Sequence, residues 1–280
     1  MTLRVLGVHG VWNYRSKLDP AGAARALSTE WAAALPDDAL DVRVAYYAHL
    51  LRTSVPQGGG PDGLSDLPPD IEQMIIDWAG EFGVVPAEAV QQGPGTVPIR
   101  WLVQRVAAAC ALNPALTAGL QKFVGVFFRE VAAYLRTPDG AARRAVRECV
   151  AEAIAAHRPD VLLAHSLGSV VAYEALLANP SLNTPLLVTL GSLLGMPAVV
   201  YDRLQPEQPP APGIRPPNVG RWVNIADPGD LIAVPRPFTS RFAPDENYDD
   251  EYIHMLDFHL VGHYLKAPAT VRALAGQTPR

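Results

Sequence analysis

Apolar residues along this chain follow two alternating patterns. Short, nearly continuous apolar runs are typical of buried parallel strands. Between them, apolar residues recur at helical spacing, so one face of each such segment is expected to be buried. The runs predict strands at 3–8, 42–47, 161–164, 186–190 and 221–225, and the spacing predicts helices at 21–34, 127–134 and 141–157. Strands that alternate with helices predict an α/β fold with a parallel sheet.

The segment between the second and third predicted strands has a different character. Glycine- and proline-rich stretches at 57–63 and 91–95 interrupt it. Helical apolar patterns occupy 68–78, 99–110 and the residues from 120 onward. The segment is too long for a simple connection between two elements.

We therefore expect one domain of residues 1–280, with residues 52–126 inserted as a helical cap. The apolar inner face of this cap is expected to shape a substrate pocket with Trp78, Phe82 and Trp101. The alternatives are a helical layer that only packs on the core and an interface for a homodimer.

The junction between the third predicted strand and the next helix carries a chemical motif. Residues 164–168 read Ala-His-Ser-Leu-Gly, a variant of the G-x-S-x-G strand-to-helix turn. Small residues on either side of the serine let the backbone reverse sharply and expose the Ser166 hydroxyl. The first amides of the following helix favour an oxyanion at the same point. Ser166 is therefore a predicted nucleophile, and the alternative is a helix N-cap.

On these residues the chain resembles the α/β-hydrolase superfamily, in particular its lipase, esterase and thioesterase branches. The resemblance covers residues 2–50 and 126–270. It implies a minimal α/β-hydrolase core of about five or six mostly parallel strands flanked by helices. It also implies an oxyanion loop beginning at the His-Gly pair of residues 9–10, with the N–H groups of Val11 and Leu167 as the oxyanion hole. Trp12 and His165, beside these motifs, are expected to contact the substrate.

A serine hydroxyl needs a base to remove its proton and an acid to orient that base. In this fold the acid follows the serine along the chain, and the histidine follows the acid. Asp230 is the favoured acid, because apolar residues follow it as in the family. Asp227 precedes a proline, where an aspartate often braces a turn, and is the alternative. Asp202, after the preceding strand, is a third candidate.

Three late histidines are candidates for the base. His259 lies near the start of the last helical pattern, where the family places its histidine, and His263 lies one turn further on. His254 lies on a strand-like stretch. His259 and His263 also have the i, i+4 spacing of a zinc pair, but no glutamate follows the first histidine and no third ligand is indicated, so no metal is predicted.

Composition narrows the classes of partner. The chain is 49% hydrophobic and 18% charged, which is ordinary for a globular protein. Its net charge of −5 offers no basic footprint for nucleic acid or an anionic membrane. No apolar run reaches the ~18 residues of a membrane span, and the first strand leaves no room for a signal peptide, so we expect a cytoplasmic location.

The three arginines of predicted helix 141–157 are expected to form a solvent-exposed face: Arg143, Arg144 and Arg147.

The sequence thus predicts a serine hydrolase that cleaves an ester or thioester of an apolar acyl group through an acyl-enzyme, without a cofactor. An acyltransferase or cyclase would use the same acyl-enzyme with another nucleophile in place of water. A catalytically silent hydrolase fold that serves as a binding or effector module is the alternative outside enzymology.

Overall fold

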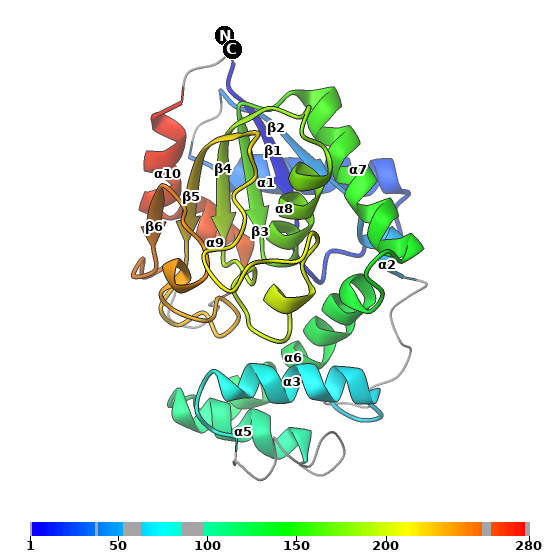
Figure 1. The fold of residues 1–280 in the computed structure, drawn as a ribbon, viewed down its shortest axis with the longest axis vertical. Helices are drawn as coiled ribbons and strands as arrows, with labels where there is room; N and C mark the ends of the chain where they lie inside the picture. The colour runs from blue at the N-terminus through cyan, green and yellow to red at the C-terminus, as the bar shows by residue number, and fades with distance from the viewer. Residues whose placement is uncertain (1, 37–38, 53–62, 86–97, 254–258, 278–280) are drawn as a thin grey trace.

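The computed structural model describes residues 2–36, 39–52, 63–85, 98–253 and 259–277. Its strands form one six-stranded sheet in the order β2-β1-β3-β4-β5-β6 (Figure 1). Every pair of neighbouring strands is parallel. The strands are β1 (Arg4–Val8), β2 (Asp41–Ala45), β3 (Val161–His165), β4 (Thr184–Leu190), β5 (Val219–Ile225) and β6 (Glu246–Tyr248). The predicted α/β class with a minimal parallel core is confirmed.

Helices cover both faces of this sheet. The described helices are α1 (Pro20–Ala34), α2 (Ala48–Leu51), α3 (Pro69–Gly80), α5 (Ile99–Ala109), α6 (Pro114–Leu135), α7 (Ala141–His157), α8 (Leu167–Ala178), α9 (Val261–Lys266) and α10 (Pro268–Ala275), with 3-10 turns at Tyr201–Arg203 and Phe238–Ser240. Successive strand residues point to opposite faces, so the strands contribute to two hydrophobic cores. Leu162 belongs to the core that includes α7 and α8, and Leu163 to the core that includes α1, α9 and α10.

The strand order places the end of β1 beside the end of β3. The chain passes from β1 outward to β2 and then returns to β3 on the other side of β1. Parallel sheets bind ligands at such a reversal, because the loops that leave the two strands diverge there and open a crevice. The His-Gly pair after β1 and Ser166 after β3 both lie at this point.

The shortest strand, β6, is the one that the apolar pattern of the sequence does not predict. β6 has only three residues, all half-buried, and pairs with β5 at the edge of the sheet. Its Glu-Asn-Tyr sequence carries no apolar run. Strand pairing, which depends on the neighbouring strand, defines this element, so the hydrophobic pattern alone could not reveal it.

The described part of the predicted insertion is helical, and the predicted boundary at residue 126 does not coincide with the end of an element. α3 and α5 pack on each other and on α6, in a layer below the carboxyl ends of the strands in Figure 1. The predicted boundary at residue 126 falls inside α6, which is one helix of 22 residues. Asn113 caps its first turn by accepting a bond from the Leu116 N–H. The cap and the core therefore share a helix.

One predicted surface feature is also wrong. Arg143 on α7 is 1% exposed, and its guanidinium binds the buried Glu174 carboxylate on α8. Arg144 is exposed and Arg147 half-buried, so only part of the three-arginine face is open to solvent. Helical spacing does not separate an exposed arginine from one paired in the interior.

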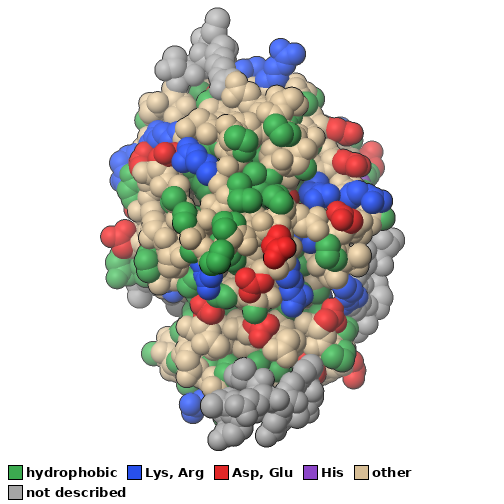
Figure 2. Space-filling view, in the orientation of Figure 1, with side chains coloured by type: hydrophobic (Ala, Val, Ile, Leu, Met, Phe, Trp, Pro, Cys, Tyr) green, Lys and Arg blue, Asp and Glu red, His purple; other side chains and the backbone are tan. Residues whose placement is uncertain are grey.

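The surface shows no segregation of charge in the view of Figure 2, where basic and acidic side chains are interspersed. Both cysteines, Cys110 and Cys149, are free and half-buried. In the described part of the chain, no helix combines the length and the apolar character that crossing a membrane requires.

Candidate active site

Ser166 occupies the sharp turn between β3 and α8. Its backbone has φ 55° and ψ −130°, an uncommon conformation for a residue with a side chain. A Cβ at Gly168 would run into the carbonyl groups of Val8 and His9. A Cβ at Gly10 would lie 2.5 Å from the Ser166 Cβ. Glycine at these positions therefore lets the loop after β1 pass directly over the serine.

Ser166, His259 and Asp230 form a continuous chain of hydrogen bonds. The Ser166 Oγ lies 2.8 Å from the His259 Nε2, and the His259 Nδ1 lies 2.8 Å from the Asp230 Oδ2. The three residues come from the loops after β3 and β5 and from the segment before α9. This arrangement brings together the three favoured candidates, which are separated by up to 93 positions in the chain.

The Asp230 carboxylate is fully buried and fully hydrogen-bonded. Its Oδ1 accepts bonds from the N–H groups of Ile232 and Ala233, and its Oδ2 accepts one from the Tyr264 hydroxyl at 2.6 Å. Burial alone would raise the pKa of Asp230, but the His259 ring and these donors lower it below its ordinary value. Asp230 is therefore ionised, and an ionised carboxylate can only accept the Nδ1 proton of His259.

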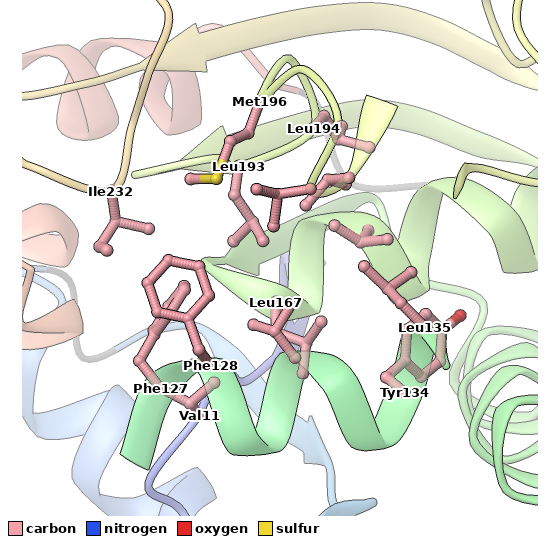
Figure 3. Close-up of a cluster of buried hydrophobic side chains, with 14 of the residues drawn as sticks. Val11, Phe127, Phe128, Tyr134, Leu135, Leu167, Leu193, Leu194, Met196 and Ile232 are labelled. Carbon is pink, nitrogen blue, oxygen red and sulfur yellow. The ribbon is translucent and has the colours of Figure 1, made fainter. Parts of the chain in front are cut away.

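The two residues of the predicted oxyanion hole also lie at this point. Leu167 is the first residue of α8, and Val11 follows Gly10 in the loop over Ser166. Neither backbone N–H donates a hydrogen bond to another described residue. The side chains of Val11 and Leu167 belong to the hydrophobic cluster that includes Phe127 and Phe128 (Figure 3).

Comparison of the chain with protein-family models, with curated proteins and with solved structures finds no match.

The alternative acids and bases have other roles. The Asp227 Oδ1 accepts a bond from the Gly229 N–H and its Oδ2 one from the Ile253 N–H, so this carboxylate braces the turn before Asp230. Asp202 is exposed and accepts from the Ala198 N–H. His263 lies half-buried on α9, outside the hydrogen-bonded chain, and His254 lies outside the described residues.

Two further histidines surround the site as neutral rings. The His9 Nδ1 donates to the Gly10 carbonyl, and its Nε2 accepts from the Tyr47 N–H. Burial lowers the pKa of His9 to about 4. Burial also lowers the pKa of His165 well below its ordinary value, and the His165 ring lies 4.9 Å from the ring of His259. His165 is 6% exposed and packs beside the candidate base.

Contrary to the expectation of an exposed hydroxyl, the site is closed. Ser166 is fully buried and His259 is 7% exposed. Two phenylalanines of α6 stand against the His259 ring, with centroid distances of 5.7 Å for Phe123 and 5.9 Å for Phe127. The apolar pattern predicts a helix here but neither phenylalanine as a site residue, since it does not show which turn of a helix meets a distant residue.

The predicted aromatic residues of the cap lie in different environments. Trp78 is fully buried against Phe82 and Phe128, and its Nε1 donates to the Leu231 carbonyl at 2.7 Å, next to the acid. It fixes α3 to the Asp230 loop. Trp101 is 39% exposed beneath the Arg105 guanidinium and does not belong to a buried inner face.

Trp12 is exposed, but its backbone is held by a residue that the sequence pattern does not indicate. The Trp12 N–H donates to the carboxylate of Glu130 on α6, with distances of 3.1 and 3.3 Å to the two oxygens. Tyr264, which binds Asp230, was also missed as a site residue. No local motif indicates either residue, because their partners are distant: Glu130 lies 118 positions from Trp12, and Tyr264 lies 34 positions from Asp230.

Proposed function

We propose that this protein is a serine hydrolase that cleaves an ester or thioester of an apolar acyl group. The observation that carries the proposal is the hydrogen-bonded chain from the Ser166 Oγ through His259 to the ionised Asp230. The parallel sheet, with the serine after β3, the acid after β5 and the histidine before α9, supports membership of the α/β-hydrolase superfamily.

The geometry supports a two-step mechanism. The Ser166 Oγ attacks the carbonyl carbon while the His259 Nε2 takes its proton, and Asp230 stabilises the resulting imidazolium. The tetrahedral intermediate collapses, the C–O or C–S bond breaks, and the leaving alcohol or thiol takes the proton from His259. Water then attacks the acyl-serine with His259 as base, which releases the acid and restores Ser166.

Negative charge on the carbonyl oxygen would be stabilised by the N–H groups of Val11 and Leu167. Each such donor can lower the barrier by roughly 3 kcal/mol when it is held in place before the reaction. An apolar acyl group suits the site, because Phe123 and Phe127 stand against His259.

An activated serine can be tested directly with a fluorophosphonate, which forms a covalent bond to a nucleophilic serine. Wild-type protein should gain the mass of one phosphonyl group, and peptide mapping should place it on Ser166. Ser166→Ala and His259→Ala should abolish labelling, since they remove the nucleophile and its base. His263→Ala is the matched control and should label like wild type. A folded wild-type protein that is not labelled would contradict the proposal.

A second outcome of the acyl-enzyme is transfer to an alcohol or amine. This outcome requires that the acceptor reach the acyl-serine in place of water. Product analysis with and without added alcohols separates the two, since transfer gives a new ester and hydrolysis gives the free acid.

A further inference from the structure

The loop over Ser166 is in an energetically unfavourable backbone conformation. Trp12 has φ 68°, a region that residues with a side chain rarely adopt. The same loop passes so close to the serine that a Cβ on Gly10 would lie 3.0 Å from the Ser166 Oγ. Neighbouring contacts must hold the loop in this position, because the residue itself does not favour it.

Part of the support comes from within the loop. The Asn13 Nδ2 donates to the carbonyl groups of Gly10 and Val11 at 3.0 and 2.9 Å. These bonds orient two carbonyl oxygens but do not involve the Trp12 N–H. That N–H donates to the carboxylate of Glu130, 118 positions further along the chain.

The helix that carries Glu130 also touches the candidate base. Phe123 of α6 contacts the Trp12 ring at 5.9 Å and the His259 ring at 5.7 Å. Phe127 of the same helix and Val11 belong to one cluster of buried side chains, drawn in Figure 3. One helix thus contacts both sides of Ser166, the loop that would bind the oxyanion and the histidine that would move the proton.

We propose that Glu130 is a positioning residue, whose carboxylate holds the Trp12 N–H and thereby keeps the Val11 N–H in place for the oxyanion. This inference deepens the proposed hydrolase function and rests on it. Glu130 does not touch the reacting atoms and acts only through the loop. Because it belongs to α6, it also makes the oxyanion loop depend on the helix shared by the cap and the core.

The charge on Glu130 strengthens its bond to the loop. Burial raises the pKa of Glu130 to about 6, against the effects of the Trp12 N–H and the Arg52 guanidinium, which lower it. The buried Tyr47 phenol also faces it, and burial together with the Glu130 charge raises the pKa of Tyr47 well above its ordinary range. The carboxylate is therefore ionised above about pH 6, and an ionised acceptor makes the stronger hydrogen bond.

The first test measures turnover of p-nitrophenyl butyrate at pH 8. Glu130→Ala should lower kcat by at least about tenfold and leave KM within about twofold, because the oxyanion exists only in the transition state. Glu130→Gln keeps an acceptor oxygen but not the charge, so it should recover only part of kcat. Glu30→Ala is the matched control: it removes an exposed carboxylate that pairs with Arg15, near the same loop, and should leave kcat unchanged.

The second test compares wild type with Glu130→Gln in the acid limb of the pH profile, where kcat/KM falls as the pH is lowered. Wild-type kcat/KM should fall as Glu130 becomes protonated near pH 6, because the neutral group makes a weaker bond to the Trp12 N–H. Glu130→Gln cannot ionise at this position, so its kcat/KM should fall less than that of wild type over the same pH range. A merely structural role would leave the shape of the limb unchanged.

The outcomes separate this inference from the function on which it rests. A wild-type protein with neither fluorophosphonate labelling nor ester turnover would overturn both. Wild-type turnover with an unchanged kcat in Glu130→Ala would overturn the positioning role alone. If Glu130→Ala does not fold, the acid limb of Glu130→Gln decides, and a limb identical to that of wild type overturns the role.

Discussion

At the scale of single residues, two oxygens fix the His259 ring. The Asp230 carboxylate accepts a hydrogen bond from one ring nitrogen, and the Ser166 hydroxyl donates one to the other. Asp230 is ionised and can only accept, so the proton lies on Nδ1 and the Nε2 lone pair faces the Ser166 hydroxyl. Four donors satisfy the Asp230 carboxylate, which offsets the cost of burying its charge. The Nε2 lone pair is thus aimed at the Ser166 hydroxyl, as the proposed proton transfer requires.

Tyr264 links this arrangement to the turn before it. Its hydroxyl donates to Asp230 and accepts from the Asp227 N–H. Tyr264→Phe should cost about 1.5–3 kcal/mol of stability, because a bond to a charged group is lost and a buried N–H loses its acceptor. Urea unfolding measures this cost. Tyr252→Phe is the control, since Tyr252 is 87% exposed, and an equal loss in both variants would contradict the role of Tyr264.

The neutral His9 predicts a pH dependence of stability. Its pKa is about 4 in the folded state and about 6.5 unfolded, so the unfolded chain binds the extra proton between these values. Stability should therefore fall as the pH falls from 7 to 5, by about 2 kcal/mol from this residue. Urea unfolding at both pH values should show a smaller fall in His9→Asn, and an equal fall would contradict the assignment.

At the scale of elements, α6 connects the inserted segment to the sheet and the candidate site. It packs with α3 and α5, while its Glu130 and two phenylalanines meet the site. The buried Arg129 on the same helix donates to the carbonyl groups of Gly63 and Ser65 at the start of the described cap. The insertion therefore contacts the site through a rigid element.

Two glycines on α6 test how closely it packs. A Cβ at Gly125 would overlap the backbone of Gly63, whereas nothing lies within 4 Å of a Cβ at Gly119. Gly125→Ala should destabilise the protein by about 1–3 kcal/mol, because backbone must move. Gly119→Ala should stabilise it by up to about 1 kcal/mol through helix propensity alone. Thermal or urea unfolding of the pair gives the answer, and the same sign for both would contradict the packing.

At the scale of the whole molecule, a buried polar network joins three helices. The Glu174 carboxylate on α8 accepts bonds from Tyr134 on α6 and Arg143 on α7, and also from the Gln205 N–H. All its described partners come from segments distant in the sequence. The network fixes the end of α6 against the two helices that cover one face of the sheet.

Removing one charge from this network should be costly. Glu174→Gln leaves the Arg143 guanidinium buried without its counter-charge, and we expect a loss of about 3–5 kcal/mol. Arg136→Met breaks an exposed pair with Asp70 and should cost no more than about 1 kcal/mol. Chemical denaturation compares the two. Similar losses of stability in both variants would mean that the buried ion pair stabilises the fold no more than the exposed one.

Much of the fold could be predicted from local pattern. The parallel strands β1 to β5 and the helices α1, α3, α5 and α7 follow from apolar runs and helical spacing, since burial of one face is encoded in neighbouring residues. The turn at Ser166 follows from the small residues that its backbone needs. The acid and the base were predicted only through their order along the chain, with alternatives at Asp227 and His263.

The sequence by itself determined the class of fold, the turn at Ser166 and a short set of partners for that serine. Only the tertiary structure decided among those partners, joined the cap to the core in one helix, and brought Tyr264 and Glu130 to the site. It also buried Arg143, which the pattern assigned to the surface. The physical reason is common to all: periodicity reports which face of an element is buried, whereas the partner of a polar group depends on which distant segment packs against that face.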